Sequence, residues 1–135
     1  MPFVVDASIV AAWFLPDETN DAADKALDML ETEDAIAPDL LSHELRNILL
    51  SAEKRKRIDQ DAVFSILLRF TSLPLTLVSG GDHITIMRLA KKHSLSAYDA
   101  AYLALAVSRA MPLATSDKKL AAAAAAENVA FAGFI

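Results

Sequence analysis

The sequence predicts an α/β sandwich, in which helices cover both faces of a mainly parallel sheet. Short apolar runs alternate with segments of helical periodicity along all 135 residues, and this alternation is typical of parallel βαβ units. Hydrophobic residues make up 54% of the chain, which argues against disorder. No linker rich in Gly, Ser or Pro interrupts the sequence, so we expect a single domain over residues 1–135.

Five strands and seven helices are expected. The strands are short aliphatic runs at residues 3–5, 35–37, 75–78, 113–115 and 129–131. The helices have apolar residues at spacings of three and four, and are expected at residues 8–15, 22–30, 39–57, 61–70, 82–93, 96–110 and 118–127. Asp39 is a candidate N-cap for the third helix, and the pair Gly80-Gly81 is expected to end the third strand. A run of alanines at 121–126 predicts helix, because alanine is the best helix former.

Charge is distributed unevenly along a chain whose net charge is −5. Residues 1–39 hold ten acids against Lys25 alone, a balance of −9, whereas residues 40–135 hold eight acids against twelve basic residues, a balance of +4. This asymmetry is compatible with a basic face that binds a polyanion, and equally with ordinary solvated helices. Cysteine is absent and no apolar run approaches the roughly eighteen residues of a membrane helix. We therefore expect a cytoplasmic protein without a membrane partner.

Four carboxylates follow or adjoin predicted strand ends. Asp6 ends the first strand and Asp117 the fourth, Glu44 lies one turn inside the helix after the second, and Asp99 is near the start of the helix at 96–110. In open α/β sheets, ligands bind beyond the carboxyl ends of the strands. Each acid also has a structural interpretation. Asp6 or Ser8, and Asp117, are possible helix caps, Ser96 and Asp99 resemble a capping box, and Glu44 is compatible with an exposed helix position.

Two observations favour a functional site over four caps. The helix that carries Asp99 is apolar almost all round, so we expect Asp99 to be buried, where a lone carboxylate is costly. Glu44 lies beside an apolar stripe, one turn from Leu41 and Ile48. Like charges about 5 Å apart repel by roughly 3 kcal/mol per pair at an effective dielectric near 20. Protons or a cation must offset that repulsion, and oxygen ligands without His or Cys suit Mg²⁺ or Mn²⁺.

Four motifs together resemble the PIN-domain ribonucleases, and in particular the VapC toxins of type II toxin–antitoxin pairs. They are Val4-Val5-Asp6-Ala7-Ser8, Glu44-Leu45-Arg46-Asn47, Ser96-Ala97-Tyr98-Asp99-Ala100-Ala101-Tyr102 and Ala114-Thr115-Ser116-Asp117-Lys118-Lys119-Leu120. A single D-x-S motif would be weak evidence for this family, whereas four acids in this order and in these contexts are strong evidence. The similarity spans essentially the whole chain, and implies a PIN-like α/β/α sandwich with a central five-stranded sheet.

The resemblance implies an acidic metal site of Asp6, Glu44, Asp99 and Asp117. Thr115 and Ser8 match positions whose hydroxyls support the site, and Asn47 matches a polar position that hydrogen-bonds within it. The implied activity is Mg²⁺- or Mn²⁺-dependent endonucleolytic cleavage of RNA by a metal-activated water. We expect Asp6 and Asp99 as direct metal ligands, with Glu44 and Asp117 holding metal-bound water or a second ion. The implied partners are a second copy of the chain and an antitoxin whose C-terminal segment occupies the active-site groove.

Two basic clusters are candidate RNA contacts. Lys118 and Lys119 directly follow Asp117, where a phosphate would offset the unfavourable helix dipole; exposed solubilising lysines are the alternative. The cluster at residues 54–57 ends the helix of Glu44, where the dipole already favours cations. Ten helical residues place Lys54 about 15 Å from Glu44, which makes this cluster a distal contact at best.

Three other functions are compatible with parts of the sequence. His43-Glu44-Leu45-Arg46-Asn47 comes within one residue of the zinc-protease helix H-E-x-x-H, but Asn47 cannot replace the second His. In an aspartyl-phosphate domain of receiver or phosphatase type, Asp6 would be the nucleophile, but the expected second acid is replaced by Ser8. A catalytically inactive PIN-like module that binds RNA or protein is the third alternative. Four intact acids disfavour it, because an inactive site need not keep a repulsive cluster.

Overall fold

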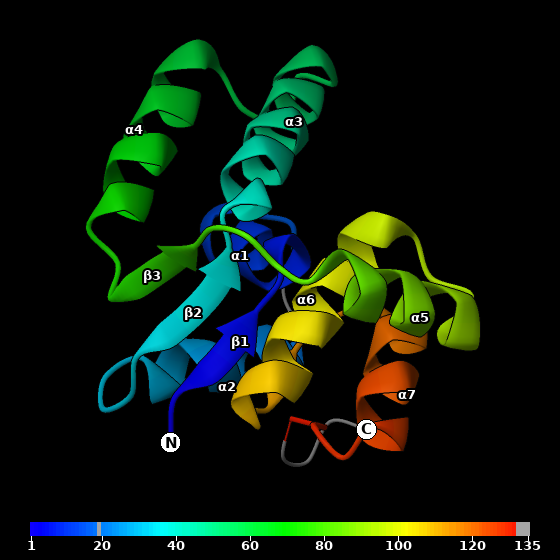
Figure 1. Cartoon of the computed structure of the whole chain (residues 1–135). Helices are drawn as coiled ribbons and strands as arrows, with labels where there is room; N and C mark the ends of the chain where they lie inside the picture. The colour runs from blue at the N-terminus through cyan, green and yellow to red at the C-terminus, as the bar shows by residue number, and fades with distance from the viewer. Residues whose placement is uncertain (19, 132–135) are drawn as a thin grey trace.

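A four-stranded parallel sheet forms the centre of the molecule and confirms the predicted α/β sandwich (Figure 1). The computed structural model describes residues 1–18 and 20–131. The strand order is β3-β2-β1-β4, with the strands β1 (Phe3–Val5), β2 (Ala35–Pro38), β3 (Leu75–Val78) and β4 (Leu113–Ala114). The central pairing sets Val4 opposite both Ile36 and Leu113. All three residues of β1 are fully buried, as expected for a strand covered on both faces.

The predicted fifth strand is reduced to one bridge between Ala130 and Leu113, so the described residues contain four strands instead of five. The backbone N–H of Leu113 donates to the carbonyl of Val129 at 2.9 Å. Val129 and Phe131 are both buried, and the ring of Phe131 packs 5.7 Å from that of Phe3. These side chains close the core, which accounts for the alternating apolar pattern without a complete strand.

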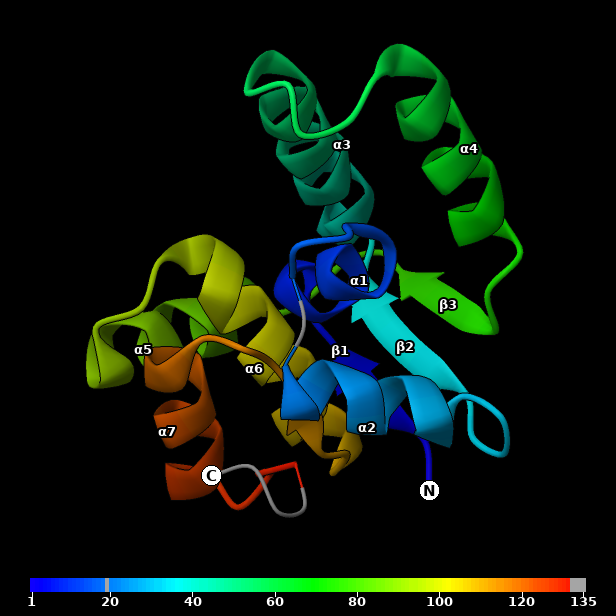
Figure 2. The same cartoon turned by 180° about the vertical axis from the view of Figure 1, so that it is seen from behind.

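Seven helices of the described chain surround the sheet, each within three residues of its predicted ends. They are α1 (Ala7–Phe14), α2 (Asp21–Met29), α3 (Leu40–Lys54), α4 (Gln60–Thr71), α5 (His83–His93), α6 (Ala97–Arg109) and α7 (Lys118–Ala126). α6 covers one face of the sheet with α5 outside it, and α1 and α2 cover the other (Figures 1 and 2). The α3–α4 hairpin extends beyond the carboxyl ends of the strands. No helix of the described residues is long and apolar enough to cross a membrane.

The prediction that Asp39 caps α3 is wrong. Its backbone is already helical (φ −65°, ψ −16°), and its side chain makes no capping hydrogen bond. Its N–H instead donates to the carbonyl of Val78 at 2.9 Å and extends the pairing of β2 with β3. The turn after β3 is as predicted, because Gly80 and Gly81 adopt φ values of +92° and +121°, which favour glycine.

The topological switch point of the sheet lies between β1 and β4. After β1 the chain adds β2 and then β3 on one side, and it then crosses to place β4 on the other side of β1. Ligand sites in open α/β sheets form at such a point, beyond the carboxyl ends of the strands. Asp6 directly follows β1, and Thr115 to Asp117 follow β4.

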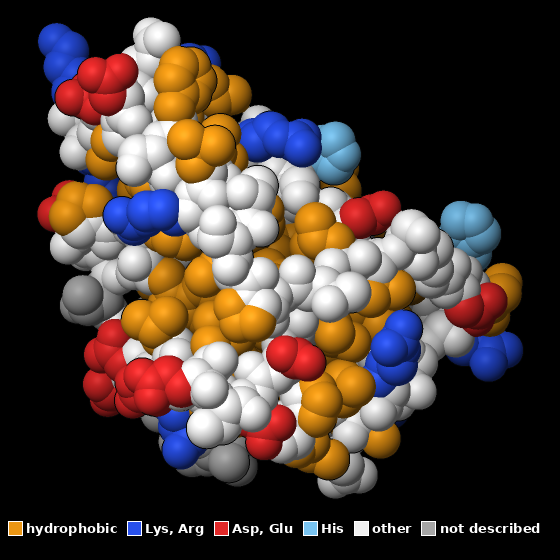
Figure 3. All heavy atoms as spheres, turned by 90° about the vertical axis from the view of Figure 1, so that its left-hand side faces the viewer, with side chains coloured by type: hydrophobic (Ala, Val, Ile, Leu, Met, Phe, Trp, Pro, Cys, Tyr) orange, Lys and Arg blue, Asp and Glu red, His pale blue; other side chains and the backbone are white. Residues whose placement is uncertain are grey.

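The side of the molecule formed by β3 and α4 carries exposed apolar side chains (Figure 3). Leu77 of the edge strand β3 is 38% exposed, and Phe64 and Leu68 of α4 are 54% and 71% exposed. Apolar side chains gathered on one face are a common feature of surfaces that contact another chain.

Candidate active site

Asp6 is a buried carboxylate at the carboxyl end of β1, with 5% of its surface exposed. Its Oδ1 accepts hydrogen bonds from the Ser8 hydroxyl at 2.6 Å and from the N–H of Ile9 at 3.2 Å. Its Oδ2 accepts from the Thr115 hydroxyl at 2.5 Å. Asp6 is therefore the N-cap of α1. Of the two candidate caps that the sequence offers for this helix, Asp6 and Ser8, it is Asp6 that caps it. The hydroxyls of Ser8 and Thr115 thus both hydrogen-bond to Asp6.

Burial raises the pKa of Asp6 to about 6, despite the hydrogen bonds from Ser8, Thr115 and Ile9 that lower it. The negative charge of Asp99 raises that pKa further. Desolvation favours the neutral acid, whereas a nearby cation favours the carboxylate. The surroundings of Asp6 therefore favour the binding of a proton or a cation.

Asp99 lies in the first turn of α6, where its N–H donates to the hydroxyl of the N-cap Ser96 at 3.1 Å. Its side chain is half-buried. The expectation that Asp99 is buried is met only in part, because this end of α6 reaches the surface and the neighbouring Tyr98 is 66% exposed. Burial raises the pKa of Asp99, the charge of Asp117 raises it further, and Lys119 partly lowers it. Asp99 thus faces the acids of the other elements from the rim of the site.

Glu44 reaches the site from α3 and is held by a tyrosine. The Tyr102 hydroxyl donates to Oε1 of Glu44 at 2.5 Å, and Tyr102 is 1% exposed. Burial raises the pKa of Glu44, the bond from Tyr102 lowers it, and the charge of Asp99 raises it. Burial and the adjacent Glu44 raise the pKa of Tyr102 as well. Tyr102 therefore remains a neutral donor that fixes the orientation of Glu44.

Asp117 is the exposed member of the four acids. Its carboxylate caps α7 by accepting from the N–H groups of Lys119 at 2.8 Å and Leu120 at 3.4 Å. Its own N–H donates to the Thr115 hydroxyl at 3.0 Å. The single side chain of Thr115 consequently connects Asp117 to Asp6.

The fold brings all four acids to one end of the sheet. Asp99 is the acid that interacts electrostatically with each of the other three. Its charge raises the pKa of both Asp6 and Glu44, and its own pKa responds to Asp117. Within residues 1–18 and 20–131, no three His, Asp or Glu side chains form a group that could hold a metal on their own. An all-oxygen set of this kind still fits Mg²⁺ or Mn²⁺, because Mg²⁺ is usually bound by one or two carboxylates and retains several waters.

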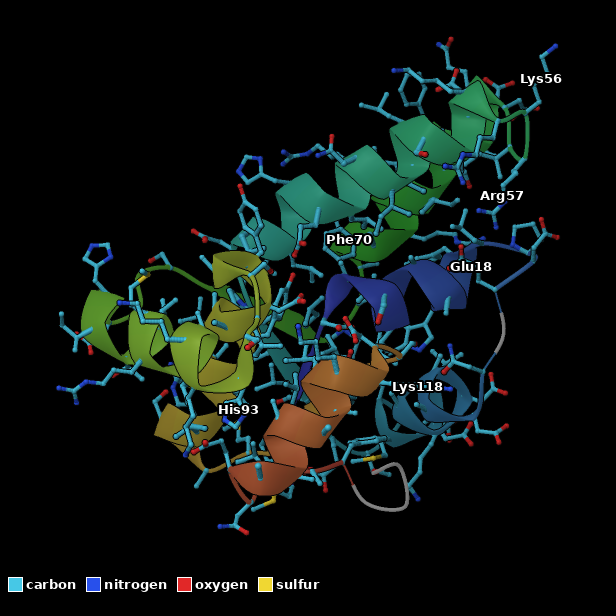
Figure 4. All side chains as sticks on the ribbon, turned by 90° about the vertical axis from the view of Figure 1, so that its right-hand side faces the viewer. Glu18, Lys56, Arg57, Phe70, His93 and Lys118 are labelled. Carbon is cyan, nitrogen blue, oxygen red and sulfur yellow. The ribbon has the colours of Figure 1, made fainter. Side chains whose placement is uncertain are left out.

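The remaining predicted residues lie around the acids. Lys118 and Lys119 are exposed at the start of α7. Asn47 is exposed on α3, and its side chain makes no hydrogen bond within the described residues, so its role stays a prediction. Of the basic cluster 54–57, Arg57 pairs with Asp17 at 3.5 Å and with Glu18 at 3.3 Å, and Lys56 points away from the body of the molecule (Figure 4).

Sequence reasoning missed Tyr102, Asn20 and Ser116. Tyr102 follows Asp99 by three residues and thus by about one helical turn, and this spacing could have indicated its position. The Asn20 side chain donates to the Ser116 hydroxyl at 3.0 Å, and the N–H of Ser116 donates to Ser8 at 3.1 Å. No local signal connects residues 96 positions apart, so this contact required the fold.

The structure does not support the zinc-protease alternative. His43 is exposed and its Nδ1 lies 3.1 Å from Arg46, on the same helix. His93 lies on α5 and contacts Glu127 at 2.7 Å, and His83 begins α5. Within the described chain, no second histidine joins His43 and Glu44 in a metal-binding group.

Comparisons with known proteins agree with the fold and the motifs. The PIN domain matches residues 3–126. The chain is 34% identical over 128 residues to Ribonuclease VapC3 of Pyrobaculum aerophilum, covering 90% of this chain and 93% of that protein. The crystal structure of PAE2754 from Pyrobaculum aerophilum superimposes with a TM-score of 0.68 at 25% identity, over 91% of this chain and 79% of that one. The chain belongs to the PIN-domain family, and its resemblance to VapC-type members is confirmed.

Proposed function

We propose that this protein is a divalent-metal-dependent endoribonuclease and the toxin of a toxin–antitoxin pair. The observation that carries the proposal is the set of four acids at the switch point between β1 and β4, where burial and mutual repulsion raise the pKa values of Asp6, Glu44 and Asp99. Membership of the PIN-domain family and the likeness to Ribonuclease VapC3 support RNA as the substrate.

Mg²⁺ or Mn²⁺ fits this donor set. Asp6 and Asp99 would bind it directly, and Glu44 and Asp117 would hold its water or a second ion. When bound, the ion supplies charge stabilisation for the scissile phosphate and activation of the attacking water.

The residues around the acids position them for this chemistry. Ser8, Ile9 and Thr115 occupy both oxygens of Asp6, so its carboxylate has one fixed orientation. Tyr102 fixes Glu44 in the same way. Such bonds to ligating carboxylates commonly affect metal affinity or activity by 10–100-fold.

The substrate requires positive charge as well as metal, because phosphate contacts supply much of the affinity for RNA. Lys118 and Lys119 are exposed beside Asp117, and Lys119 lowers the pKa of Asp99. Both lysines would contact the phosphates of an RNA strand that approaches the acids. Arg57 is a weaker candidate, because Asp17 and Glu18 already pair with it.

The proposed partners follow from the same likeness. An antitoxin would insert its C-terminal segment at the active site in the cytoplasm, and two copies of the chain would form a homodimer. The exposed apolar side chains of β3 and α4 are compatible with contact to another chain.

RNA cleavage by the purified protein tests the proposed activity. We expect cleavage in Mg²⁺ or Mn²⁺, none in EDTA, and loss of cleavage in Asp99→Asn. Asp28→Asn, an exposed acid of α2, is the matched control and should retain activity. Metal-dependent cleavage at the full rate by Asp99→Asn would show that these acids are not the active site. Absence of any cleavage by the wild type would favour an inactive binding module.

A further inference from the structure

A groove of about 780 Å³ runs between α2 and α7 and opens onto the candidate active site. Thr115, Ser116 and Asp117 line its polar end, and these residues directly follow β4. The groove is therefore continuous with the acids, and the roles proposed above use only its active-site end, at Thr115, Asp117 and Lys118. A cavity of this volume lies within the range that accommodates small ligands.

The polar end of the groove offers a hydrogen-bond donor to a ligand. The Ser116 hydroxyl accepts from Nδ2 of Asn20 at 3.0 Å, and no residue in the described part of the chain accepts its proton. Asn20 is itself fixed, because its Oδ1 caps α2 by accepting from the N–H of Ala23 at 2.7 Å. The Ser116 hydroxyl is thus held in place with its proton available.

Ser116 is also connected to the buried acid. Its N–H donates to the Ser8 hydroxyl at 3.1 Å, and Ser8 in turn donates to Asp6 at 2.6 Å. A ligand bound at Ser116 would therefore lie at a fixed position relative to Asp6. This arrangement suits a substrate that extends from the acids into the groove.

The walls of the groove differ in charge and polarity. α7 contributes the small apolar side chains of Ala121, Ala122 and Ala125, with Lys118 at the active-site end, whereas α2 contributes Asp21. Figure 4 shows Lys118 at the start of α7 beside α2. A phosphate would follow the α7 wall near Lys118 and avoid Asp21, and an uncharged ring would fit against the alanines, where no long side chain intervenes.

We propose that the groove between α2 and α7 binds the nucleotide next to the scissile phosphate of the RNA. The base lies against the alanines of α7, and the Ser116 hydroxyl, positioned by Asn20, donates to an acceptor of that nucleotide. Ser116 is then a specificity-determining residue and Asn20 a positioning residue. This inference rests on the proposed ribonuclease function and names a substrate subsite for it.

Two phenylalanine variants on the same helix test the subsite. Ala122 and Ala126 are both exposed on α7, but only Ala122 lines the groove. The probe is a short, labelled single-stranded RNA of mixed sequence, and its binding is measured by fluorescence anisotropy in Mg²⁺. Both variants and their parent carry Asp99→Asn, which is expected to prevent cleavage during the measurement. We expect Ala122→Phe to weaken binding about tenfold, as for the loss of one base contact, and Ala126→Phe to leave it unchanged.

Cleavage of the unmodified RNA pool is sequenced in parallel with Ser116→Ala, an exposed and mild substitution. The subsite predicts that Ser116→Ala changes the preferred base at one position beside the cut. Equal binding by Ala122→Phe and Ala126→Phe, with cleavage by the wild type intact, would overturn the subsite and leave the ribonuclease proposal standing. A wild type that neither binds nor cleaves RNA would overturn both.

Discussion

The ends of β1 and β4 use the same local device and differ in their surroundings. Each strand ends near an aspartate that N-caps the following helix, Asp6 for α1 and Asp117 for α7. Asp6 follows an interior strand and is 5% exposed, whereas Asp117 follows a strand paired on its outer side by only one bridge and is exposed. Burial raises the pKa of Asp6 to about 6. Location in the sheet, and not the capping role, therefore distinguishes the acid whose pKa is raised to about 6.

Thr115 connects the two ends. Its hydroxyl donates to Asp6 and accepts from the N–H of Asp117. The buried Asp6 and the exposed Asp117 are consequently held at a fixed position relative to each other, although they are distant in sequence. Substituting Asp6, Thr115 and Asp117 separately tests how much each strand end contributes to RNA cleavage and to stability.

The largest effect is expected from the amide substitution of each acid. Asp6→Asn removes a proposed direct ligand and should lower Mg²⁺-dependent RNA cleavage by about 10²-fold or more, in the range of other single electrostatic contributions to catalysis. Asp117→Asn retains an oxygen for capping α7 and removes only the charge of the exposed acid. RNA cleavage by this variant should therefore fall only about tenfold. Initial rates on one RNA measure both. Equal losses would contradict the difference between the buried and the exposed acid.

Stability should change with pH because of Asp6. Its pKa of about 6 in the folded protein exceeds the ordinary value of 3.8, so the folded state retains the proton between these values and the unfolded state does not. The free energy of unfolding therefore falls as pH rises from about 4 to above 6, by roughly 3 kcal/mol for this group.

Asp6→Asn cannot ionise and should lack this component, so it should gain stability relative to the wild type as pH rises from 4 to 8 in EDTA. Denaturant unfolding at each pH measures the difference. Asp117→Asn is the control at the exposed position. Parallel pH profiles for the wild type and Asp6→Asn would show that burial does not raise the pKa of Asp6.

Breaking the connection at Thr115 should have an intermediate effect. Thr115→Val keeps the shape but removes the donor to Oδ2 of Asp6 and the acceptor of the N–H of Asp117, at a cost of about 1–3 kcal/mol in the free energy of unfolding. Activity should fall about 10–100-fold. Thr115→Ser keeps the hydroxyl and should recover most of both losses. A serine variant as impaired as the valine variant would indicate that packing, and not the hydroxyl, matters at this position.

The smallest effect is expected from the cap of α7. Asp117→Ala removes the acceptor of the N–H groups of Lys119 and Leu120 and should lower stability by about 1 kcal/mol, whereas Asp117→Asn should preserve it. Thermal melts in EDTA compare the two variants. An equal loss in both would assign the stabilisation to the charge instead of the hydrogen bonds.

The elements that follow from local periodicity were predicted well. All seven helices and the first four strands lie near their expected positions, because apolar spacing and turn residues reflect local chemistry. The errors concern tertiary context. Residues 129–131 have the pattern of a strand, but Val129 and Phe131 use it to close the core. Asp39 has the chemistry of a cap, but its backbone is helical.

In the candidate site, too, local sequence predicts some features and tertiary context determines the others. Asp6 and Asp117 could be placed from the strands they follow, and Asp99 from its helix. The partners that fix them come from other elements, since Tyr102 of α6 holds Glu44 of α3, and Thr115 after β4 holds Asp6 after β1. The exposure of Tyr98 also shows that an apolar helix can present one end to solvent.

Binding of Mn²⁺ tests most directly the claim that these acids form a metal site. Thermal melts at pH 7.5 with increasing Mn²⁺ should show a saturable rise in melting temperature for the wild type and Asp28→Asn, because a ligand that binds only the folded state stabilises it. Asp6→Asn and Asp99→Asn should lose most of that rise. An equal rise in all four proteins, or none in the wild type, would contradict the account.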